Sequence, residues 1–411
     1  MALLNTLNNM ETINKPVIII GAGYAGLSLA LFLKKAGITS TVFEAYPDVK
    51  GIGGGIGLAP NGINVLQELG LDEKVINAGK IFDYNNFRNY KGKFLARIKL
   101  NAIKKFGQPF VMISRATLHQ ILYQEAAKQG IAVNFQKRLK GIHESTEGIT
   151  AVFDDGSSFE GSLVIGADGI HSSTRKIIFN NAFPEEYTGF YGAGGFVQKS
   201  ALEPYLGQYD HDALNLSFGL SGFFGFSFQT ANELMWWCSL ELSEQDAKYT
   251  QTNLSAEALK SKLTADYEDF YQPVPQLITN SDHVIKTVMY DMPSLPKWYK
   301  GRTILIGDAV HAVSPTSGLG ASLALEDAMI LAKLLRAHTT AEYSIAFSDF
   351  QSIRKPRVEK VRADAQKHNT DKKVHSLASA WFRDTTMSIF LKLFGLGPMG
   401  WKYNYKVNWD D

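Results

Sequence analysis

The sequence is poor in cysteine, with Cys238 as the only one among 411 residues. A single cysteine excludes an intramolecular disulfide and any metal site built from a cysteine cluster, and we predict no metal centre. So few thiols are compatible with a reducing compartment, and we expect the protein to be cytoplasmic.

A large excess of one charge and long apolar runs are also lacking. The chain has 42 Lys and Arg against 40 Asp and Glu, which leaves no strong field to attract nucleic acid. No stretch approaches the roughly 18 uninterrupted apolar residues of a membrane-spanning helix. The segment from Met1 to Lys15 lacks a secretory pattern. We therefore expect neither a nucleic-acid partner nor a membrane span.

The chain does have the length and apolar content for two packed domains, since its 411 residues are 45% hydrophobic. Residues 16–20 form a short apolar run, residues 27–36 follow at helical spacing, and residues 41–43 form a second apolar run. Strand, helix and strand in this order are typical of a parallel βαβ unit.

The middle of the chain changes from helical spacing to alternation. Even-numbered apolar residues from 214 to 220 alternate with polar or small ones, and the even-numbered phenylalanines from 224 to 228 continue that parity. A period of two is typical of strands. We therefore predict an antiparallel sheet over about residues 187–290, which the hairpin-like stretch 82–98 is expected to join. The α/β pattern returns at 303–306.

A glycine-rich segment follows the first predicted strand, where residues 21–26 read Gly-Ala-Gly-Tyr-Ala-Gly. In such a segment Gly21 permits the tight turn, Gly23 lets the backbone approach a pyrophosphate, and Gly26 allows close helix packing. Glu44, 18 positions after Gly26, ends the next predicted strand, where a carboxylate can bind an adenosine ribose. The context predicts dinucleotide binding.

The same glycine pattern occurs again at residues 395–400. That copy contains Pro398 and follows a helical pattern without a strand–helix unit around it, so we interpret it as a structural turn. The first copy alone would fit an NAD dehydrogenase equally well. Two further motifs decide the cofactor.

The first of these motifs, residues 166–175, follows a predicted buried strand. Asp168 at the strand end can bond polar ligand groups, and Arg175 either faces a phosphate or anchors the turn. A capped turn with Ser172 or Ser173 as N-cap is an open interpretation that is compatible with ligand binding.

The last motif, residues 307–328, places Asp308 at the end of a strand, where its carboxylate can bond a ribityl hydroxyl. Gly318 and Gly320 then begin a long helix. The positive end of that helix suits the anion of a reduced isoalloxazine ring. Together the three motifs predict a flavin dinucleotide rather than NAD.

The set of motifs resembles the group A flavoprotein monooxygenases with the p-hydroxybenzoate hydroxylase fold, in particular the salicylate hydroxylase and tetracycline destructase branches. Residues 55–71, GIGLAPNGINVLQELGL, and Arg115 in ISRATLHQIL also match that family. The resemblance covers about residues 15–365. It implies FAD as the cofactor, with NADPH or NADH docking transiently, since no second GxGxxG stands in a suitable context.

The patterns and the resemblance predict an α/β fold, in which a Rossmann-like FAD-binding domain carries an inserted antiparallel β-sheet substrate domain and is followed by C-terminal helices. The expected FAD-binding domain covers 14–80, 104–181 and 282–345, the sheet domain 81–103 and 182–281, and the C-terminal helical segment 346–411. The residues expected to contact the cofactor are Gly21, Gly23, Tyr24, Ala25, Gly26, Glu44, Arg115, Asp168, Asp308, Pro315, Gly318, Leu319 and Gly320.

Two positions depart from the family pattern. Ser322 stands where many members have asparagine, and the stretch 192–195 lacks the arginine often found after Tyr-x-Gly. These departures concern the reductant and the binding of a substrate anion, and they leave FAD binding untouched.

The resemblance implies that NAD(P)H reduces FAD, that O2 forms a C4a-hydroperoxyflavin, and that one oxygen atom passes to an aromatic or polycyclic substrate. Small aromatic and tetracycline-like substrates both stay open, and we expect a monomer or weak homodimer. A phenolic substrate would gain from a base. His211 is a candidate, although a lone histidine is more often structural. The expected pocket residues are Asn215, Ser217, Phe224, Phe226 and Trp237.

Other functions remain to be separated from this one. A flavin halogenase is disfavoured because the sequence has no Trp-x-Trp-x-Ile-Pro segment. An FAD-dependent reductase or epoxidase would use the same cofactor site, and the product mass would distinguish it. A non-catalytic binding protein on an FAD scaffold is the alternative from another class, and a purified protein lacking flavin would favour it.

Two C-terminal stretches have simple structural interpretations. The basic run over residues 354–362 is predicted to be a solvated helix face. The amphipathic segment 387–394 is expected to pack on the sheet domain as a lid rather than to touch a membrane.

Overall fold

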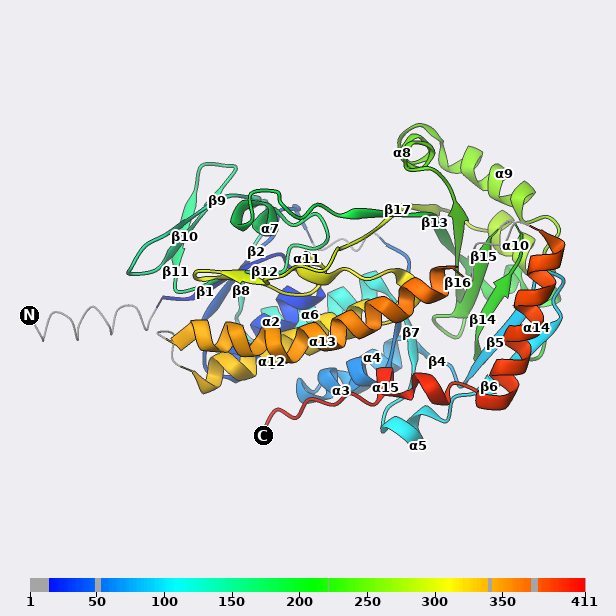
Figure 1. Cartoon of the computed structure of the whole chain (residues 1–411), viewed down its shortest axis with the longest axis horizontal. Helices are drawn as coiled ribbons and strands as arrows, with labels where there is room; N and C mark the ends of the chain where they lie inside the picture. Colours follow the sequence, from blue (N-terminus) through cyan, green and yellow to red (C-terminus); the bar gives the residue numbers. More distant parts are fainter. Residues whose placement is uncertain (1–14, 49–52, 221, 339–341, 371–375, 411) are drawn as a thin grey trace, which may run out of the picture.

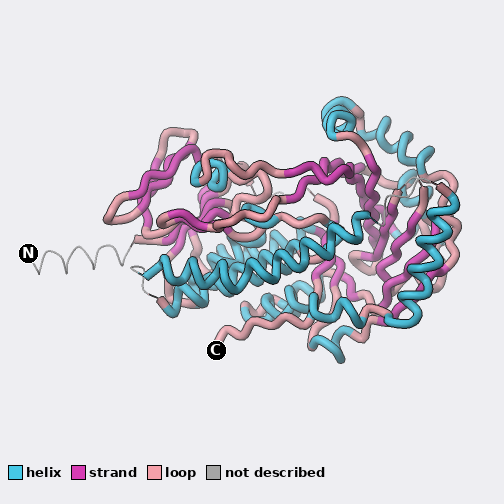
Figure 2. Tube along the Cα trace, viewed as in Figure 1, coloured by secondary structure: helices cyan, strands magenta, loops and turns pink. Residues whose placement is uncertain are grey.

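The computed structural model describes residues 15–48, 53–220, 222–338, 342–370 and 376–410. Sheets lie at both ends of the molecule, and the long helices α12 and α13 run lengthwise along it (Figures 1 and 2). The predicted mixed α/β architecture is confirmed.

A six-stranded sheet forms the first end, with strand order β18-β19-β12-β1-β2-β8. Neighbouring strands are parallel except β18 with β19. β1 is buried along its whole length, as its run of valine and isoleucine predicts. The strands are β1 (Val17–Ile20), β2 (Ser40–Phe43), β8 (Ala132–Asn134), β12 (Val164–Gly166), β18 (Tyr299–Lys300) and β19 (Thr303–Leu305).

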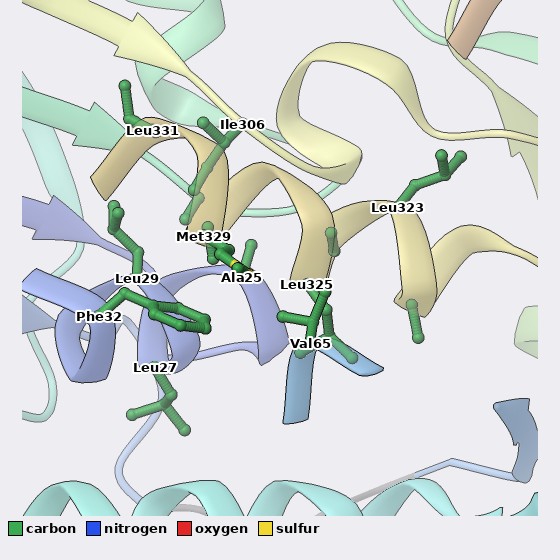
Figure 3. Close-up of a cluster of buried hydrophobic side chains, with 14 of the residues drawn as sticks. Ala25, Leu27, Leu29, Phe32, Val65, Ile306, Leu323, Leu325, Met329 and Leu331 are labelled. Atoms are coloured by element: carbon green, nitrogen blue, oxygen red, sulfur yellow. The ribbon is translucent and has the colours of Figure 1, made fainter. Parts of the chain in front are cut away.

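The two faces of β1 pack against different layers. Val17 and Ile19 join the large core with α2 and α12, whereas Ile18 and Ile20 pack on the small antiparallel sheet β11-β10-β9. Figure 3 shows side chains of α2, α3 and α12 meeting in the large core. The elements of these layers are α2 (Tyr24–Lys35), α6 (Arg115–Lys128), β9 (Leu139–Glu144), β10 (Ile149–Phe153), β11 (Ser158–Gly161), α7 (Ser173–Ile178), α11 (Asp308–His311), η3 (Pro315–Ser317), α12 (Gly320–Ala337) and α13 (Tyr343–Thr370).

A three-stranded antiparallel sheet, β3-β7-β4, lies with short helices between the two ends (Figure 1). Its helix α3 packs against α12. The elements are β3 (Gly55–Leu58), α3 (Pro60–Glu68), α4 (Asp72–Ala78), β4 (Lys80–Ile81), α5 (Ala102–Phe106) and β7 (Val111–Ser114).

Seven strands form the second end, in the order β17-β13-β16-β15-β14-β5-β6. All neighbours are antiparallel except β14 with β5. Helices α8, α9 and α10 cover one face through an aromatic-rich core, and we call this the helix-covered face and the opposite one the inner face. The elements are β5 (Tyr84–Asn89), β6 (Phe94–Lys99), β13 (Glu186–Gln198), η1 (Lys199–Ala201), η2 (Glu203–Tyr205), β14 (Ala213–Phe218), β15 (Phe223–Phe228), β16 (Glu233–Glu241), α8 (Glu244–Asn253), α9 (Ala256–Asp266), α10 (Val274–Thr279) and β17 (Val284–Asp291).

The prediction that the even-numbered phenylalanines of β15 share a face with Leu216 is wrong. Leu216 pairs with Gly225, and Asn215 pairs with Phe226. Directly paired residues point to the same face of a sheet. After the connection between β14 and β15, the even-numbered residues therefore point to the opposite face of the sheet. This places those phenylalanines on the helix-covered face.

The predicted boundary at residue 282 also differs from the structure. β17 pairs with β13 at the edge of the seven-stranded sheet before the chain returns to β18 and β19. Long-range pairing of this kind leaves little trace in the local sequence.

The C-terminal region divides between the two ends of the molecule. α13 packs on α12, whereas α14 (Leu377–Phe394) packs on β6. Residues 395–400 end α14 and form the short turn η5 (Gly397–Met399), as predicted, before α15 (Gly400–Tyr403). Among the residues that the structure describes, no helix combines the length and apolar character needed to cross a membrane.

Candidate functional site

The turn between β1 and α2 is packed tightly against the segment that follows β12. Gly21 has a φ of 103°, and a Cβ there would overlap the carbonyl oxygen of Ala167. A Cβ on Gly26 would overlap the backbone oxygen of Gly21. Both positions therefore require glycine, and their packing brings two of the predicted motifs together.

Two side chains hold this turn in place. Glu44 accepts hydrogen bonds from the Ala22 N–H at 2.8 Å and from the Tyr46 N–H at 3.0 Å. On the other side, His119 Nε2 lies 2.5 Å from the carbonyl oxygen of Ala22. His119 was not among the predicted residues, although its position four residues after Arg115 on α6 is a signal that could have found it.

The N-termini of α2 and α12 are open. A Cβ on Gly23, Gly318 or Gly320 would meet no atom within 4 Å. Neither helix has a side-chain cap or an acidic residue in its first turn. Free N–H groups and the positive ends of the helix dipoles therefore favour anionic groups at both helix ends. These features fit the pyrophosphate and the reduced ring of a flavin dinucleotide.

Tyr24, Arg115 and Asp308 come together beside this opening from three separate segments. The Tyr24 hydroxyl donates to the backbone oxygen of Arg115 at 3.1 Å. Burial raises the pKa of Tyr24 to about 12, with Arg115 opposing the shift and Asp308 adding to it. The surrounding protein atoms also raise the pKa of Asp308, and the positive charges of His311 and Arg115 oppose this increase. The side chain of Asp308 is nevertheless exposed to solvent.

The backbone that carries Asp308 is anchored by a buried carboxylate. Asp327 Oδ2 accepts from the Gly307 N–H at 2.8 Å and lies 2.5 Å from His311 Nε2. Its other oxygen accepts from Arg354 Nε at 2.6 Å. Burial opposes ionisation, but His311 and Arg354 lower the pKa of Asp327 to about 2. Asp327 therefore stays ionised and fixes the turn at the start of α11.

Arg354 is buried and the side chain of Arg357 is only 8% exposed, so the prediction of a solvated basic face is wrong for both. Arg354 Nη1 lies 2.7 Å from Glu326 Oε2, and neither side chain has exposed surface. Arg357 donates to both oxygens of Glu326 at 2.7 and 2.8 Å. Asn61 donates to the same carboxylate at 2.6 Å and ties α3 to the network. The partners lie on other helices, which a local charge pattern cannot reveal.

Asp168 caps the turn that opens α7. It accepts from Ser172 Oγ at 2.6 Å and from the Thr174 N–H at 2.9 Å. Burial raises its pKa, and these hydrogen bonds offset part of the increase. Arg175 is buried and donates to the backbone oxygen of Ala309 at 2.9 Å. Of the two interpretations of Arg175, the structure shows the one in which it anchors the turn, here to α11.

The inner face of the seven-stranded sheet is the face that meets the Rossmann-like half. Met235 occupies the space that a Cβ on Gly55 would need. Phe196, Leu214 and Trp237 pack against the large core that includes α2 and α12. Side chains on this face are therefore placed toward the motif-bearing turns.

Among the five predicted pocket residues, Trp237 is the one on the inner face. Its indole lies across Gly225, where a Cβ would come 2.5 Å from the ring, and Gly194 pairs with it from β13. The surface around the indole is therefore flat. Along the central part of this face no side chain is ionisable; the residues there are Gly192, Gly194, Phe196, Leu214, Leu216, Phe218, Phe223, Gly225, Ser227, Met235, Trp237 and Ser239.

Asn215 and Ser217 lie instead in a polar network on the helix-covered face. Asn215 Oδ1 accepts from Asn86 Nδ2 at 2.8 Å, and Ser217 Oγ lies 3.1 Å from the Tyr271 hydroxyl. Both are fully buried. Their hydrogen bonds are satisfied within the protein, and the structure does not bring them together with Trp237.

Phe224 and Phe226 also belong to the helix-covered face. Phe224 stacks on Trp236 with ring centroids 5.4 Å apart, and Phe226 is buried in the same cluster. His211, the candidate base, is exposed and stacks on Phe228, another residue of that face. None of these three residues adjoins the surface around Trp237.

The two departures from the family pattern both coincide with close packing. A Cβ on Gly62 would lie 2.6 Å from Ser322 Oγ, so α3 and α12 leave little space for a larger side chain at residue 322. A Cβ on Gly194 would lie 2.8 Å from the backbone oxygen of Trp236, which disfavours any side chain at that point of β13.

Comparisons with known proteins agree with this geometry. Residues 14–365 match the family described as FAD binding domain. The chain is 26% identical to aurachin C monooxygenase/isomerase of Stigmatella aurantiaca, covering 90% of this chain and 93% of that protein. It is 27% identical to 6-hydroxynicotinate 3-monooxygenase of Bordetella bronchiseptica, covering 84% and 89%. A solved structure of a Klebsiella pneumoniae HpxO variant complexed with FAD has a TM-score of 0.82 at 25% identity, covering 94% of this chain and 97% of that chain.

Proposed function

The chain belongs to the FAD binding domain family, and on that premise we propose that it oxygenates an uncharged, flat aromatic or polycyclic substrate. The protein is an FAD-dependent monooxygenase that takes its electrons from NAD(P)H. The substrate class is inferred from the inner face of the sheet. A cytoplasmic location, where NAD(P)H is supplied, is part of the same proposal.

The overall reaction consumes one substrate C–H bond, one O2, one NAD(P)H and one proton. It yields the hydroxylated ring, NAD(P)+ and water. Bound FAD takes up the two electrons and activates O2. The protein binds the cofactor, orients the ring of the substrate and excludes water from the reacting atoms.

We assign the cofactor contacts to the open helix ends. The α2 end, with Gly21, Gly23 and Gly26, holds the pyrophosphate, and Glu44 binds the adenosine ribose while it braces the turn. The open space above Gly23 and the hydrogen bond from the Ala22 N–H support this assignment. The remaining contacts of this half are assigned to Tyr24, Ala25 and Arg115.

The flavin half of the cofactor is assigned to the segment that follows β19. Asp308 faces the ribityl chain, and the α12 end with Gly318 and Gly320 faces the ring. The support is the exposed carboxylate of Asp308 and the open space at both glycines. Asp168 contributes indirectly, by holding the turn that it caps. The backbone of Pro315 and Leu319 provides the remaining contacts to the flavin half.

The flat surface around Trp237 carries the substrate proposal. An aromatic ring stacked on the indole gains about 0.5–1.5 kcal/mol beyond its buried area. A substrate carboxylate stacked on Trp237 would be desolvated without a partner among the strand side chains, because none of those on the central inner face is ionisable. Arg383 of α14 lies over the Phe218 ring, but its guanidinium is already paired with Asp384 at 2.8 Å. Crowding at Gly194 disfavours a side chain that could supply a charge from β13. The surface therefore favours a flat ring without a carboxylate.

The test compares neutral compounds with their carboxylated partners. The purified protein would be checked for a flavin spectrum, and NADPH and NADH oxidation would be followed in air with phenol against salicylate, naphthol against hydroxynaphthoate, and a tetracycline. We expect a neutral ring to stimulate oxidation with a kcat/KM about tenfold or more above that of its acid, because the carboxylate of the acid would be desolvated without a charge partner. The product should be heavier by one oxygen atom.

Each other result has a distinct meaning. Equal or better oxidation with the acids would refute the uncharged-substrate proposal and leave the monooxygenase intact. A product without added oxygen would point to a reductase. Protein that neither carries nor rebinds FAD would favour a non-catalytic scaffold.

A further inference from the structure

Helix α14 packs on the sheet with one side and presents an apolar surface to solvent with the other. On the packed side, Ser388 Oγ donates to the backbone oxygen of Leu95 at 2.7 Å, and Arg383 lies over the Phe218 ring. On the outer side, Trp381 is 68% exposed and Leu393 is 71% exposed. The other exposed large apolar residues of α14 are Leu377, Phe382, Ile389, Phe390 and Phe394.

Five of these residues, which we call the apolar stripe, lie on the same side of α14: Trp381, Phe382, Ile389, Phe390 and Leu393. At about 100° per residue they fall within about half of the helix circumference, opposite the buried Ala380 and Leu391. Single exposed apolar residues need no explanation, whereas a contiguous group marks an interaction surface. A helix that is apolar on both sides is normally covered on both sides.

The chain segments next to α14 are rich in basic residues. Residues 84–106, which include β5, β6 and α5, hold seven Lys and Arg but no Asp or Glu, and residues 385–409 hold three Lys but no Asp or Glu. Carboxylates nearby neutralise part of this charge, since Arg88, Lys91 and Arg97 each lie within 4 Å of an aspartate and Asp384 of α14 pairs with Arg383. The whole chain has a net charge of only +2. Within the part of the chain that the structure describes, Lys104, Lys105 and Lys392 are exposed and make no ion pair.

α5 and the end of α14 lie at the same corner of the molecule. A Cβ on Gly395, the C-cap of α14, would lie 4.0 Å from Ile98 near the end of β6, and β6 leads directly to α5. α5 itself exposes Ile103 beside Lys104 and Lys105. Figure 1 shows α14 along the outer edge beyond β5 and β6, with α5 projecting near its lower end.

We propose that this corner docks on the surface of an anionic lipid bilayer. Aromatic and aliphatic side chains of the apolar stripe enter the interface between headgroups and acyl chains, and the lysines face the anionic headgroups. The docking is peripheral, which agrees with the lack of a spanning helix among the described residues. The packing of α14 on β6 agrees with the expectation that this segment lies on the sheet domain. The proposal departs from the expectation that the segment does not touch a membrane, because the apolar stripe is exposed.

The local charge favours a lipid surface over a second copy of the chain. A two-fold dimer through the apolar stripe would bring the exposed lysines of both copies to the same interface, with no added negative charge to offset them. An anionic bilayer instead attracts the free lysines and buries the stripe at the same time. This inference does not rest on the proposed substrate class.

The test uses the full FAD-loaded protein in flotation assays with phosphatidylcholine vesicles, with and without phosphatidylglycerol. We expect binding that requires phosphatidylglycerol and weakens with salt. The variant Trp381→Ser/Leu393→Ser should bind at least about tenfold more weakly, because two inserted side chains are lost. Lys104→Ala/Lys105→Ala should bind about 30-fold more weakly, since each lysine contributes about a factor of five at an anionic surface.

Matched controls carry the same changes elsewhere on the surface. Tyr249→Ser removes an exposed aromatic ring on α8, and Lys128→Ala/Lys300→Ala removes two exposed lysines of the other half. Both controls should bind as the unchanged protein does, and every variant should keep its flavin spectrum.

Three results would overturn the proposal. The first is flavin-loaded protein that does not float with phosphatidylglycerol vesicles at low salt. The second is a loss of binding in the controls as large as in the corner variants. The third is a dimer in light scattering that dissociates in Trp381→Ser/Leu393→Ser without vesicle binding, which would assign the apolar stripe to a second copy.

Discussion

Each half of the molecule contains a buried ion pair, and the two pairs stabilise different parts of the backbone. In the Rossmann-like half, Arg354 donates to Asp327 at 2.6 Å with no exposed surface on either side chain. In the sheet, Arg88 lies 2.8 Å from Asp210 on the helix-covered face, also almost without exposure. The first pair fixes the turn that carries Asp308, and the second braces strands behind the surface around Trp237. The role of a buried ion pair therefore depends on the backbone segment that it holds, even where the geometry of two pairs is similar.

Replacing Arg354 should have the largest effect on both folding and cofactor retention. Arg354→Met leaves the carboxylates of Asp327 and Glu326 buried without this partner, which should cost about 5 kcal/mol of unfolding free energy. Because Asp327 also holds the Gly307 N–H, FAD affinity should fall. Denaturant unfolding and FAD titration would measure the two effects. An FAD affinity equal to that of the unchanged protein would show that this network does not position the cofactor turn.

The sheet offers a comparison between its two faces. Phe224→Ala on the helix-covered face should cost about 4 kcal/mol of stability, because a fully buried ring leaves a cavity. Trp237→Ala should cost less stability, since the indole is partly exposed, but should lower kcat/KM about tenfold through lost stacking. Thermal unfolding and steady-state kinetics would check both variants. The reverse pattern would place the substrate on the helix-covered face.

Replacing Arg88 is the matched counterpart of the Arg354 change. Arg88→Met leaves Asp210 buried and should cost about 3 kcal/mol, somewhat less than at Arg354 because Arg88 retains slight exposure. FAD affinity should be unchanged in the folded protein, because this pair contacts no residue near the cofactor turn. Denaturant unfolding and FAD titration would again be used. A parallel fall in FAD affinity would contradict the division of roles between the two pairs.

The smallest effect is expected at Asp291, the last residue of β17, where the chain passes back from the sheet. Burial raises its pKa to about 6, with Arg362 opposing the shift and Glu186 adding to it. A carboxyl group whose folded pKa is raised destabilises the fold when ionised, so the cost is present above about pH 6 and absent below about pH 4. Asp291→Asn should therefore stabilise the protein by about 1 kcal/mol at pH 8, allowing for solvent screening, and by nothing at pH 4. Unfolding curves at the two pH values would show it, and a pH-independent difference would contradict the assignment.

The cofactor half was largely predictable from short stretches of sequence. A Cβ at Gly21 or Gly26 would overlap backbone, so glycine is required at these positions wherever the turn forms. Asp308 follows closely after β19 of the parallel sheet and begins α11, and the carboxyl ends of such strands meet at one edge. Local chemistry and regular geometry thus determine the positions of these residues. The contact of His119 from α6 was not predicted from the sequence.

The sequence by itself determined the α/β class, the strand–turn–helix units and the identity of the cofactor, because each depends on residues close together in the chain. Tertiary structure alone decided which sheet face Phe224 and Phe226 occupy, that Arg354 is buried against Asp327, and that one side of α14 is left uncovered. These outcomes depend on strand register and on partners far away in sequence, and a one-residue change of register moves every side chain of a strand to the other face.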